Sequence, residues 1–393
     1  MNNSLKTPYY LIDKDFLDYE LEKLNSALRE TWGSYIIGYS YKTNALPWVL
    51  KYFRNHGCFA EVVSDDEYNL AKSIGVGEII YNGVAKSKDT FLEAIRNNNI
   101  VNIDSEREIE WLDSLEPNLY EVGIRVNFDL EAKCPGQTQC GKDGERFGFC
   151  YENGELKRAI EQIEKKGVSV VGIHLHKSSK TRMPDIYKAI AETAVEIAEK
   201  YRRNFKYVDI GGGFFGGLSN KPQFIEYFDL ITSILKRCFN SNDTTLIVEP
   251  GMALIGAAVD YYTSVVDVKR TTKNVFVTTD GSRTQIDPLM TKNSYFNEII
   301  RKDVKNRNTV DRQIISGFTC MEHDRLFEVL NGEEVLPNDI IIYHKVGAYT
   351  MCLSPRFIKR FPDIYVKEGD RLLQVRERWT EEDYKNKSIG EEE

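Results

Sequence analysis

The stretch SYIIGYSYKTN (residues 34–44) begins the pattern that decides the fold, because it is an apolar run that ends in polar residues. Seven more short runs of this kind follow along the chain: FAEVVS (59–64), EIIYN (78–82), IVNID (100–104), VGIRVN (122–127), VVGIHLH (170–176), KYVDIG (206–211) and TLIVE (245–249). Nearly continuous apolar runs are typical of parallel strands that are covered on both faces. The chain is therefore expected to contain a parallel sheet.

Helical patterns separate these runs, at residues 45–54, 66–74, 90–97, 106–115, 155–165, 184–202 and 222–239. Eight strands that alternate with helices predict an α/β protein with a (β/α)8 barrel, which we place at residues 30–261. An open, doubly wound parallel sheet is the alternative that the same alternation allows.

The sequence beyond this region changes character. Strand-like runs at 261–268, 275–279, 313–316, 340–343 and 371–375 are joined by polar turns rather than by helices. We therefore predict a second, mostly β domain that comprises residues 262–380 together with 1–29, where an early strand is expected at 9–12. Residues 381–393 are polar and are expected to form an acidic tail.

The charge balance limits the partners of the protein. The 393 residues include 60 acidic and 52 basic side chains, which give a formal net charge of -8. This charge argues against nucleic acid or an anionic membrane as the main partner. No apolar run approaches the roughly 20 residues that span a bilayer. The first residues lack the apolar core of a signal peptide, so a cytoplasmic location is expected.

The seven cysteines are not arranged like a known metal site. An odd number in a cytoplasmic chain favours reduced thiols. Cys134, Cys140 and Cys150 lie nearest to one another, but their spacings of six and ten residues match no usual zinc pattern. No metal is therefore predicted.

Polar residues cluster at the strand ends, where barrel enzymes build their active sites. Lys42 follows the first strand among tyrosines, and partial desolvation could make its amine a nucleophile. A solvated lysine at a strand exit fits the same position. Glu249 could hold a pyridine nitrogen protonated, or it could pair with a basic neighbour. His176 could stack on an aromatic cofactor or be a hydrogen-bonded structural residue.

A glycine triplet follows the seventh strand. Gly211, Gly212 and Gly213 would let backbone N–H groups face an anion, and the Ser179 hydroxyl could bind the same group. Any tight turn after a strand could also use such glycines, so the triplet alone is weak evidence.

The order of these features is more specific than any one of them. Lys42 on the first strand, HLHKSS (174–179) on the sixth, GGG (211–213) after the seventh and EPG (249–251) on the eighth form one arrangement. It closely resembles the fold-type III decarboxylases of diaminopimelate, ornithine and arginine. The resemblance runs from TPYYL (7–11) to residues 376–383 and includes RFG (146–148), TDG (279–281) and GAY (347–349).

The resemblance implies pyridoxal 5'-phosphate (PLP) as cofactor and assigns roles to individual residues. Lys42 resembles the Schiff-base lysine, His176 the histidine stacked on the ring, and Glu249 the partner of the pyridine nitrogen. The implied phosphate cradle and its neighbours are Ser179, Gly211, Gly212, Gly213, Gly251 and Tyr349.

Two further implications concern an acid and a thiol. Glu61 resembles an acidic residue close to the cofactor, paired with Arg125. Cys320 resembles the cysteine that reaches in from a second subunit, which implies a homodimer with shared active sites. The catalytic residues implied are Lys42, Cys320, His176 and Glu249.

Three departures from the family concern the substrate. Met252 replaces the arginine of a frequent EPGR segment, IDPLM (286–290) lacks the arginine and tyrosine of diaminopimelate decarboxylases, and Met321 stands where the family has Glu or Asp. Arg283 and Glu322 are candidate substrate contacts in their place. These departures favour an unusual or conjugated amino acid over a classical basic one.

The resulting prediction is a PLP-dependent decarboxylase that releases CO2 from the α-carboxylate of an amino acid or amino-acid conjugate through a Schiff base at Lys42. Three alternatives remain at this stage: a diaminopimelate decarboxylase of lysine biosynthesis, an amino-acid racemase of the same fold type, and a non-catalytic PLP-binding regulator. The HxH, EPG and Cys320 segments favour a decarboxylase over a racemase. The presence of Lys42, His176, Glu249 and Cys320 argues against a regulator.

Overall fold

The chain forms two compact units in the computed structural model, which describes residues 5–302 and 307–387. One unit is Glu20–Leu254, and the other joins Met1–Tyr19 to Ile255–Glu393. The sequence placed these divisions at 29/30 and 261/262. The first division instead falls inside a helix, α1 (Lys14–Thr31), and the second inside the short helix α10 (Met252–Ile255).

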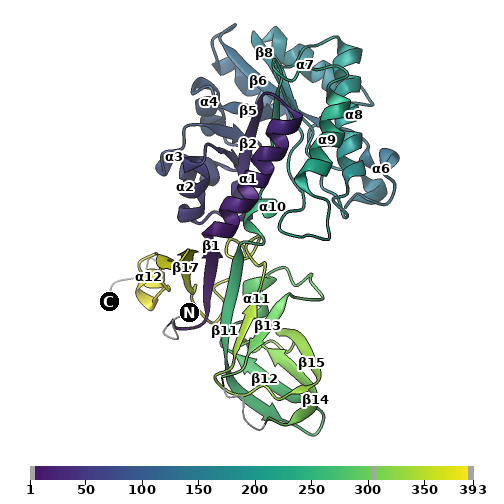
Figure 1. Ribbon diagram of the computed structural model, residues 1–393. Helices are drawn as coiled ribbons and strands as arrows, with labels where there is room; N and C mark the ends of the chain where they lie inside the picture. The colour runs from purple at the N-terminus through teal and green to yellow at the C-terminus, as the bar shows by residue number, and fades with distance from the viewer. Residues whose placement is uncertain (1–4, 303–306, 388–393) are drawn as a thin grey trace. The chain divides into compact units, whose positions relative to one another are not determined.

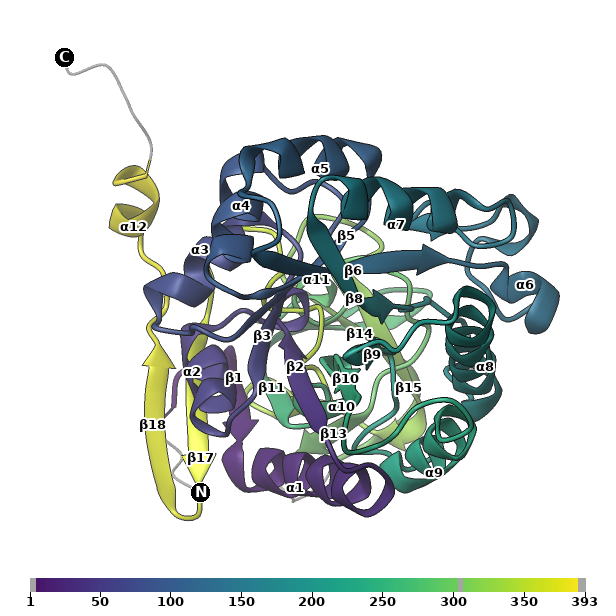
Figure 2. The same ribbon diagram turned by 90° about the horizontal axis from the view of Figure 1, so that it is seen from above.

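The unit Glu20–Leu254 is a closed parallel barrel. Its strands are β2 (Tyr35–Ser40), β3 (Phe59–Val62), β4 (Ile79–Tyr81), β5 (Ile100–Ile103), β6 (Tyr120–Asn127), β8 (Val168–His174), β9 (Tyr207–Asp209) and β10 (Thr245–Val248). Neighbouring strands pair in parallel, and β5 pairs with β6 to close the ring (Figure 2). The short strand β7 (Phe149–Cys150) adds to β6. The predicted barrel is confirmed, and the open doubly wound alternative is wrong.

Helices surround the barrel strands, as Figures 1 and 2 show. Besides α1 they are α2 (Pro47–Asn55), α3 (Asp65–Ser73), α4 (Lys88–Arg96), α5 (Glu106–Trp111), α6 (Leu130–Lys133), α7 (Glu155–Lys165), α8 (Pro184–Tyr201) and α9 (Phe224–Leu235). α7 illustrates why they form: Leu156, Ala159, Ile160 and Ile163 recur at helical spacing and are all buried. α1 was not predicted, although its leucines 17, 21, 24 and 28 follow the same rule and are also buried.

The barrel interior is built around a tyrosine. A Cβ atom at Gly123 of β6 or at Gly172 of β8 would collide with the side chain of Tyr207, so these glycines make room for the ring. The Tyr207 hydroxyl donates to Asn102 Oδ1 at 2.9 Å. Ile80 and Ile247 pack with Tyr207 in one buried cluster. The hydrogen-bonded pair of Tyr207 and Asn102 therefore lies within an otherwise apolar core.

The other unit contains a mixed, mostly antiparallel sheet in the order β15-β14-β12-β11-β1-β17-β18, with β16 paired to β11 and to β13. The strands are β1 (Tyr9–Asp13), β11 (Val259–Arg270), β12 (Val275–Thr279), β13 (Asn297–Ile300), β14 (Thr309–Ser316), β15 (Arg325–Glu333), β16 (Ile340–Tyr343), β17 (Asp363–Glu368) and β18 (Arg371–Arg376). The predicted β domain is confirmed. β13, β15 and β17 were not predicted: exposed residues interrupt the apolar pattern of β13 and β15, whereas β17 is largely buried.

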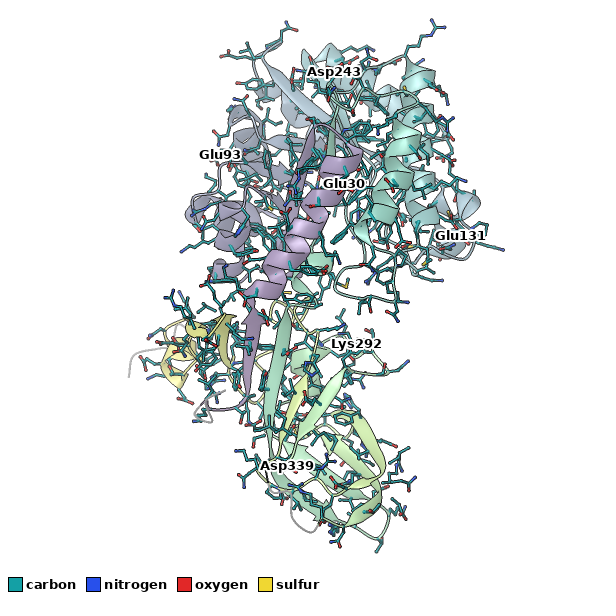
Figure 3. All side chains as sticks on the ribbon, viewed as in Figure 1. Glu30, Glu93, Glu131, Asp243, Lys292 and Asp339 are labelled. Atoms are coloured by element: carbon teal, nitrogen blue, oxygen red, sulfur yellow. The ribbon has the colours of Figure 1, made fainter. Side chains whose placement is uncertain are left out.

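Ion pairs and a short helix complete this unit. Asp339, labelled in Figure 3, is buried and accepts hydrogen bonds from the Arg307 guanidinium. Lys292, also labelled there, lies in the loop after the helix α11 (Arg283–Ile286).

The tail predicted for 381–393 begins with the helix α12 (Glu381–Lys385), and residues 388–393 lie outside the described part of the chain. No helix among the described residues is long and apolar enough to cross a membrane.

Candidate active site

The side chains predicted to carry chemistry in the barrel unit gather where its strands end. Lys42 lies in a 3-10 turn, Tyr41–Thr43, that directly follows β2. Glu61 belongs to the end of β3, and Glu249 directly follows β10. Because all eight strands are parallel, these positions share one rim of the barrel.

Lys42 is held by a buried carboxylate. Its Nζ donates to Glu61 Oε2 at 2.6 Å, and the lysine side chain is 38% exposed whereas that of Glu61 is 1% exposed. Glu61 also accepts hydrogen bonds from Ser40 Oγ at 2.5 Å and from Asn82 Nδ2 at 3.1 Å. The lysine side chain is therefore partly exposed, and its amine is oriented by a buried acid.

The expected pairing of Glu61 with Arg125 is wrong. Arg125 instead pairs with Asp104, at 3.3 Å between Nη1 and Oδ2, and its guanidinium lies 4.5 Å from the centroid of the Phe147 ring. Asp104 follows β5, the neighbour of the strand that carries Arg125, so the two meet across adjacent strands. The ion-pair partner of Glu61 is therefore Lys42.

Asn82, a polar residue at a strand end to which the sequence assigned no role, connects Glu61 and Glu249. Asn82 Nδ2 donates to Glu61 Oε1 and, at 2.5 Å, to Glu249 Oε1. Its Oδ1 accepts from Asn102 Nδ2 at 2.8 Å, and Asn102 in turn accepts from Tyr207. An amide at the end of one apolar strand and another inside the next was the available signal, because buried amides need partners.

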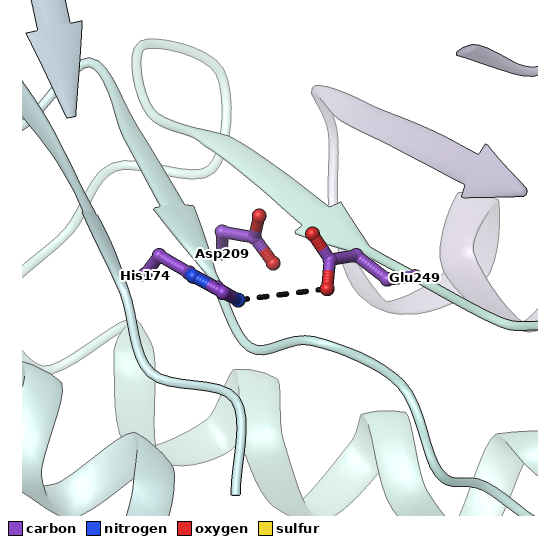
Figure 4. A group of neighbouring side chains, drawn as sticks. All are labelled: His174, Asp209 and Glu249. Atoms are coloured by element: carbon purple, nitrogen blue, oxygen red, sulfur yellow. Dashed lines mark ion pairs between the residues drawn. The ribbon is translucent and has the colours of Figure 1, made fainter. Parts of the chain in front are cut away.

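Glu249 is the centre of a buried acid cluster with Asp209 and His174 (Figure 4). His174 Nε2 lies 3.5 Å from Glu249 Oε2. Burial and the charge of Glu249 raise the pKa of Asp209 well above its ordinary value. Although burial opposes ionisation of Glu249, His174, Lys42 and the proton on Asp209 hold the pKa of this glutamate well below its usual range. The pair therefore holds one proton, on Asp209, and Glu249 is ionised.

The same three residues bear on the prediction that no metal binds. Their potential ligand atoms lie within 4.8 Å of one another, which is close enough to share an ion. The absence of a metal stays a prediction.

His176 presents a neutral ring. Enclosure by the surrounding protein lowers the pKa of His176 to about 3, so the imidazole is uncharged near neutrality. Nδ1 accepts a hydrogen bond from the Gly212 N–H at 3.2 Å, which requires the tautomer with the proton on Nε2. The ring keeps some exposed surface, and such a surface is suited to stacking on an aromatic ligand.

Glycine is required in the triplet because other parts of the chain approach its backbone closely. Gly211 and Gly213 have φ values of +71° and +92°. A Cβ at Gly211 would collide with the His176 ring, and one at Gly212 with the carbonyl oxygen of Glu249. The N–H groups of Gly211 and Gly212 already donate to Asp209 Oδ1 and to His176. Within the described chain the N–H of Gly213 makes no hydrogen bond, so it can serve an anion.

Ser179 and Gly251 border the same rim. Ser179 Oγ accepts from the backbone N–H of Arg182 at 3.0 Å, which fixes the turn after β8. A Cβ at Gly251 would collide with Thr43 Oγ1, the residue next to Lys42. The glycine of the EPG segment thus allows the turn that carries the lysine to pack against β10.

The remaining predicted residues belong to the β unit. Arg283 is committed locally: Nη2 binds Asp287 Oδ2 and the Lys292 carbonyl, each at 3.0 Å. The Glu322 side chain is 97% exposed and lies 3.5 Å from Arg325. Cys320 and Tyr349 are exposed, and Met321 is partly exposed.

A buried aspartate shapes the loop that carries Cys320. Asp324 Oδ2 accepts from Thr319 Oγ1 at 2.6 Å, and Asp324 Oδ1 accepts from the Arg283 N–H at 2.8 Å. The cysteine therefore stands on an ordered turn rather than on a loose loop.

The barrel residues fit the predicted cofactor. Lys42 supplies an amine on a partly exposed side chain, Glu249 an ionised carboxylate, and Gly213 an N–H group without a hydrogen bond among the described residues. Asp209 Oδ2 and both ring nitrogens of His174 are buried and make no hydrogen bond with the described residues. Buried polar atoms without partners are rare unless a ligand or water serves them.

Comparison with known proteins also indicates a pyridoxal-phosphate enzyme. The family model for the pyridoxal binding domain of pyridoxal-dependent decarboxylases matches residues 19–256. Diaminopimelate decarboxylase of Aquifex aeolicus is 27% identical over 95% of this chain and 90% of its own length. The same enzyme of Methanocaldococcus jannaschii is 27% identical over 98% and 91%. A crystal structure of the M. jannaschii enzyme superposes with a TM-score of 0.85 at 25% identity, covering 98% of this chain and 93% of that one.

The match spans more than half of the chain and contains Lys42, Glu61, His176 and Glu249. It agrees with the barrel, with the rim of polar side chains and with the residues that suit PLP. The chain belongs to the family of pyridoxal-phosphate-dependent amino-acid decarboxylases, and it is a carboxy-lyase.

Proposed function

We propose that this enzyme removes an α-carboxylate from diaminopimelate, releasing CO2 and lysine. The observation that carries the proposal is the coverage of diaminopimelate decarboxylases over nearly their whole length, in sequence and in structure. These relatives favour diaminopimelate over the unusual amino acid that the sequence departures led us to expect. Membership of a decarboxylase family also favours CO2 release over the racemase and regulator alternatives.

The residues of the barrel rim have complementary roles in this proposal. PLP, when bound, supplies an electron sink for the substrate carbon that loses CO2. Lys42 holds the cofactor through its amine, and Glu61 orients that amine. Glu249, kept ionised by His174 and by the proton on Asp209, holds a proton at the pyridine nitrogen. His176 stacks its neutral ring on the cofactor without adding a competing charge.

The β unit contributes the remaining groups. Cys320, or a group that it assists, returns a proton to the substrate carbon, and Tyr349 joins the phosphate contacts. Both assignments are part of a homodimer in which the two subunits share their active sites. A cytoplasmic location also remains a prediction from the sequence.

A second substrate class is favoured by one specific observation. Met321 stands where the family places an acid, and Glu322, the nearest acid, is almost fully exposed. An unpaired ammonium in a dry site costs several kcal/mol. An amino acid without a distal ammonium would avoid this cost.

One assay separates the two substrates. Purified enzyme with PLP is supplied separately with diaminopimelate, ornithine, lysine, arginine and N-acylated diamino acids, and CO2 release is measured. Diaminopimelate is expected to give the highest kcat/KM, with lysine as the product. Release of CO2 from an acylated substrate but not from diaminopimelate would overturn the proposal and support the second class.

A further inference from the structure

Arg182 brings a guanidinium to the place where three loops of the barrel rim meet. Its Nη1 lies 3.1 Å from the sulfur of Met252, which follows β10. Its Cζ lies 5.5 Å from the centroid of the Phe215 ring, which follows the glycine triplet after β9. Its own N–H donates to Ser179 Oγ in the loop after β8. Arg182 thus touches the loops after β9 and β10 through its guanidinium and Ser179 in its own loop, after β8, through its backbone N–H.

The pairing of this guanidinium is unusual for a partly exposed arginine. Among residues 5–302 and 307–387, no carboxylate forms an ion pair with Arg182, although it is only partly exposed. The polar contact of the guanidinium is with the thioether of Met252, which is a weak acceptor. A guanidinium has five N–H donors in a planar fork, and phosphate oxygens are its preferred partners. The charge and the donors of Arg182 are therefore available for an anion.

The backbone of Arg182 is held in an uncommon conformation. Its φ is +54°, in the left-handed region that non-glycine residues rarely adopt. The hydrogen bond to Ser179 fixes the N–H side, and Tyr227 OH donates to the Arg182 carbonyl at 2.6 Å on the other. These contacts determine where the side chain leaves the loop, immediately before α8.

We infer that Arg182 binds the phosphate of PLP, a role that rests on the cofactor site proposed above. It acts with the free N–H of Gly213 and with the Ser179 hydroxyl. Arg182 provides a guanidinium at a point where Met252, the residue after the EPG segment, offers no charge. Arg182 therefore recognises the phosphate and not the pyridine ring.

Binding of PLP and of pyridoxal, which lacks the phosphate, tests this directly. The full-length protein is freed of cofactor and titrated with each compound, with absorbance as the readout. Arg182→Gln is expected to weaken PLP binding about tenfold to a hundredfold, as for the loss of a charge-assisted hydrogen bond. Its affinity for pyridoxal should stay within about twofold of wild type. Inorganic phosphate should compete with PLP less effectively in the variant than in wild type.

Two variants serve as controls. Arg158→Gln removes an exposed arginine from α7 and should leave both affinities unchanged. Met252→Arg, added to Arg182→Gln, should restore most of the PLP affinity, because residue 252 touches the guanidinium of Arg182. Arg182→Lys keeps the charge without the fork and should give an intermediate loss.

The outcomes are distinguishable. Unchanged PLP affinity in Arg182→Gln, or an equal loss of PLP and pyridoxal affinity, would overturn the role of Arg182 and leave the cofactor site intact. A wild-type protein that binds neither compound would overturn the cofactor site itself and the inference with it.

Discussion

Replacing Asp209 by asparagine should make the protein more stable at neutral pH, although the residue is completely buried in the candidate site. Asp209 carries a proton in the folded state, because burial and Glu249 raise its pKa well above the ordinary value near 4. Asparagine has nearly the same shape and no charge, and its oxygen can accept from the Gly211 N–H, as Asp209 Oδ1 does at 2.8 Å.

The magnitude follows from proton linkage. Above the pKa of an unfolded aspartate, folding of the wild type must take up a proton at Asp209, so its stability falls as pH rises toward the raised folded-state pKa. The slope for one such proton is about 1.4 kcal/mol per pH unit. The asparagine variant does not take up this proton. Its advantage over wild type should therefore grow with pH above the pKa of an unfolded aspartate, by up to about 1.4 kcal/mol per pH unit.

The assay is urea unfolding at pH 5, 6 and 7 on protein freed of cofactor. Asp209→Ala is the informative comparison, because it leaves the Gly211 N–H without a partner and should cost about 1–3 kcal/mol relative to asparagine. Asp243→Asn, on the exposed surface of the barrel unit (Figure 3), controls for the loss of an ordinary aspartate. A pH-independent difference between Asp209→Asn and wild type would refute the assignment of the proton to Asp209.

Four other predictions follow from the same geometry. Lys42→Ala should lose the covalent link to PLP, checked by borohydride reduction and peptide mapping; a label on another lysine in the wild type would contradict the assignment. Glu249→Gln should still bind PLP but lose most decarboxylase activity, because an amide cannot hold the ring nitrogen protonated; activity within a few-fold of wild type would leave Glu249 a structural role. Lys86→Met should cost about 3–5 kcal/mol in urea unfolding, because it leaves the buried Glu108, 3.1 Å from Lys86 Nζ, without a counter-charge; adding Glu108→Leu should recover most of the loss. Mixing inactive Lys42→Ala and Cys320→Ala subunits should restore some CO2 release if sites are shared, and no recovery despite confirmed subunit exchange would argue against sharing.

The barrel could be predicted from the sequence because its signal is local. A parallel strand covered on both faces must be apolar almost throughout, and a helix that packs on it must repeat its apolar residues every three or four positions. Both patterns are visible in short windows such as IVNID (100–104) and α7. The strands β13 and β15 are more exposed, so no comparable pattern marked them.

The candidate site could be predicted only as a set of positions. Lys42, His176, Gly211 to Gly213 and Glu249 were identified because each follows a strand, and parallel strands bring their ends to one rim. The side chains with which these residues pair could not be predicted. The pairing of Lys42 with Glu61 and of Arg125 with Asp104 depends on side-chain directions across neighbouring strands, which the sequence does not encode locally.

The sequence by itself determined the fold class and the position of the rim, because these depend on periodicity, and its resemblance to a known family implied the type of cofactor. The tertiary structure decided the electrostatics of the site. Asn82 links Glu61 to Glu249 only when the chain is closed into a barrel. Only in that barrel does burial raise the pKa of Asp209. Arg182 likewise meets Met252 through folding alone, since 70 residues separate them in the chain. Desolvation and contact between distant residues exist only in the folded state, and they set the charges on which the chemistry depends.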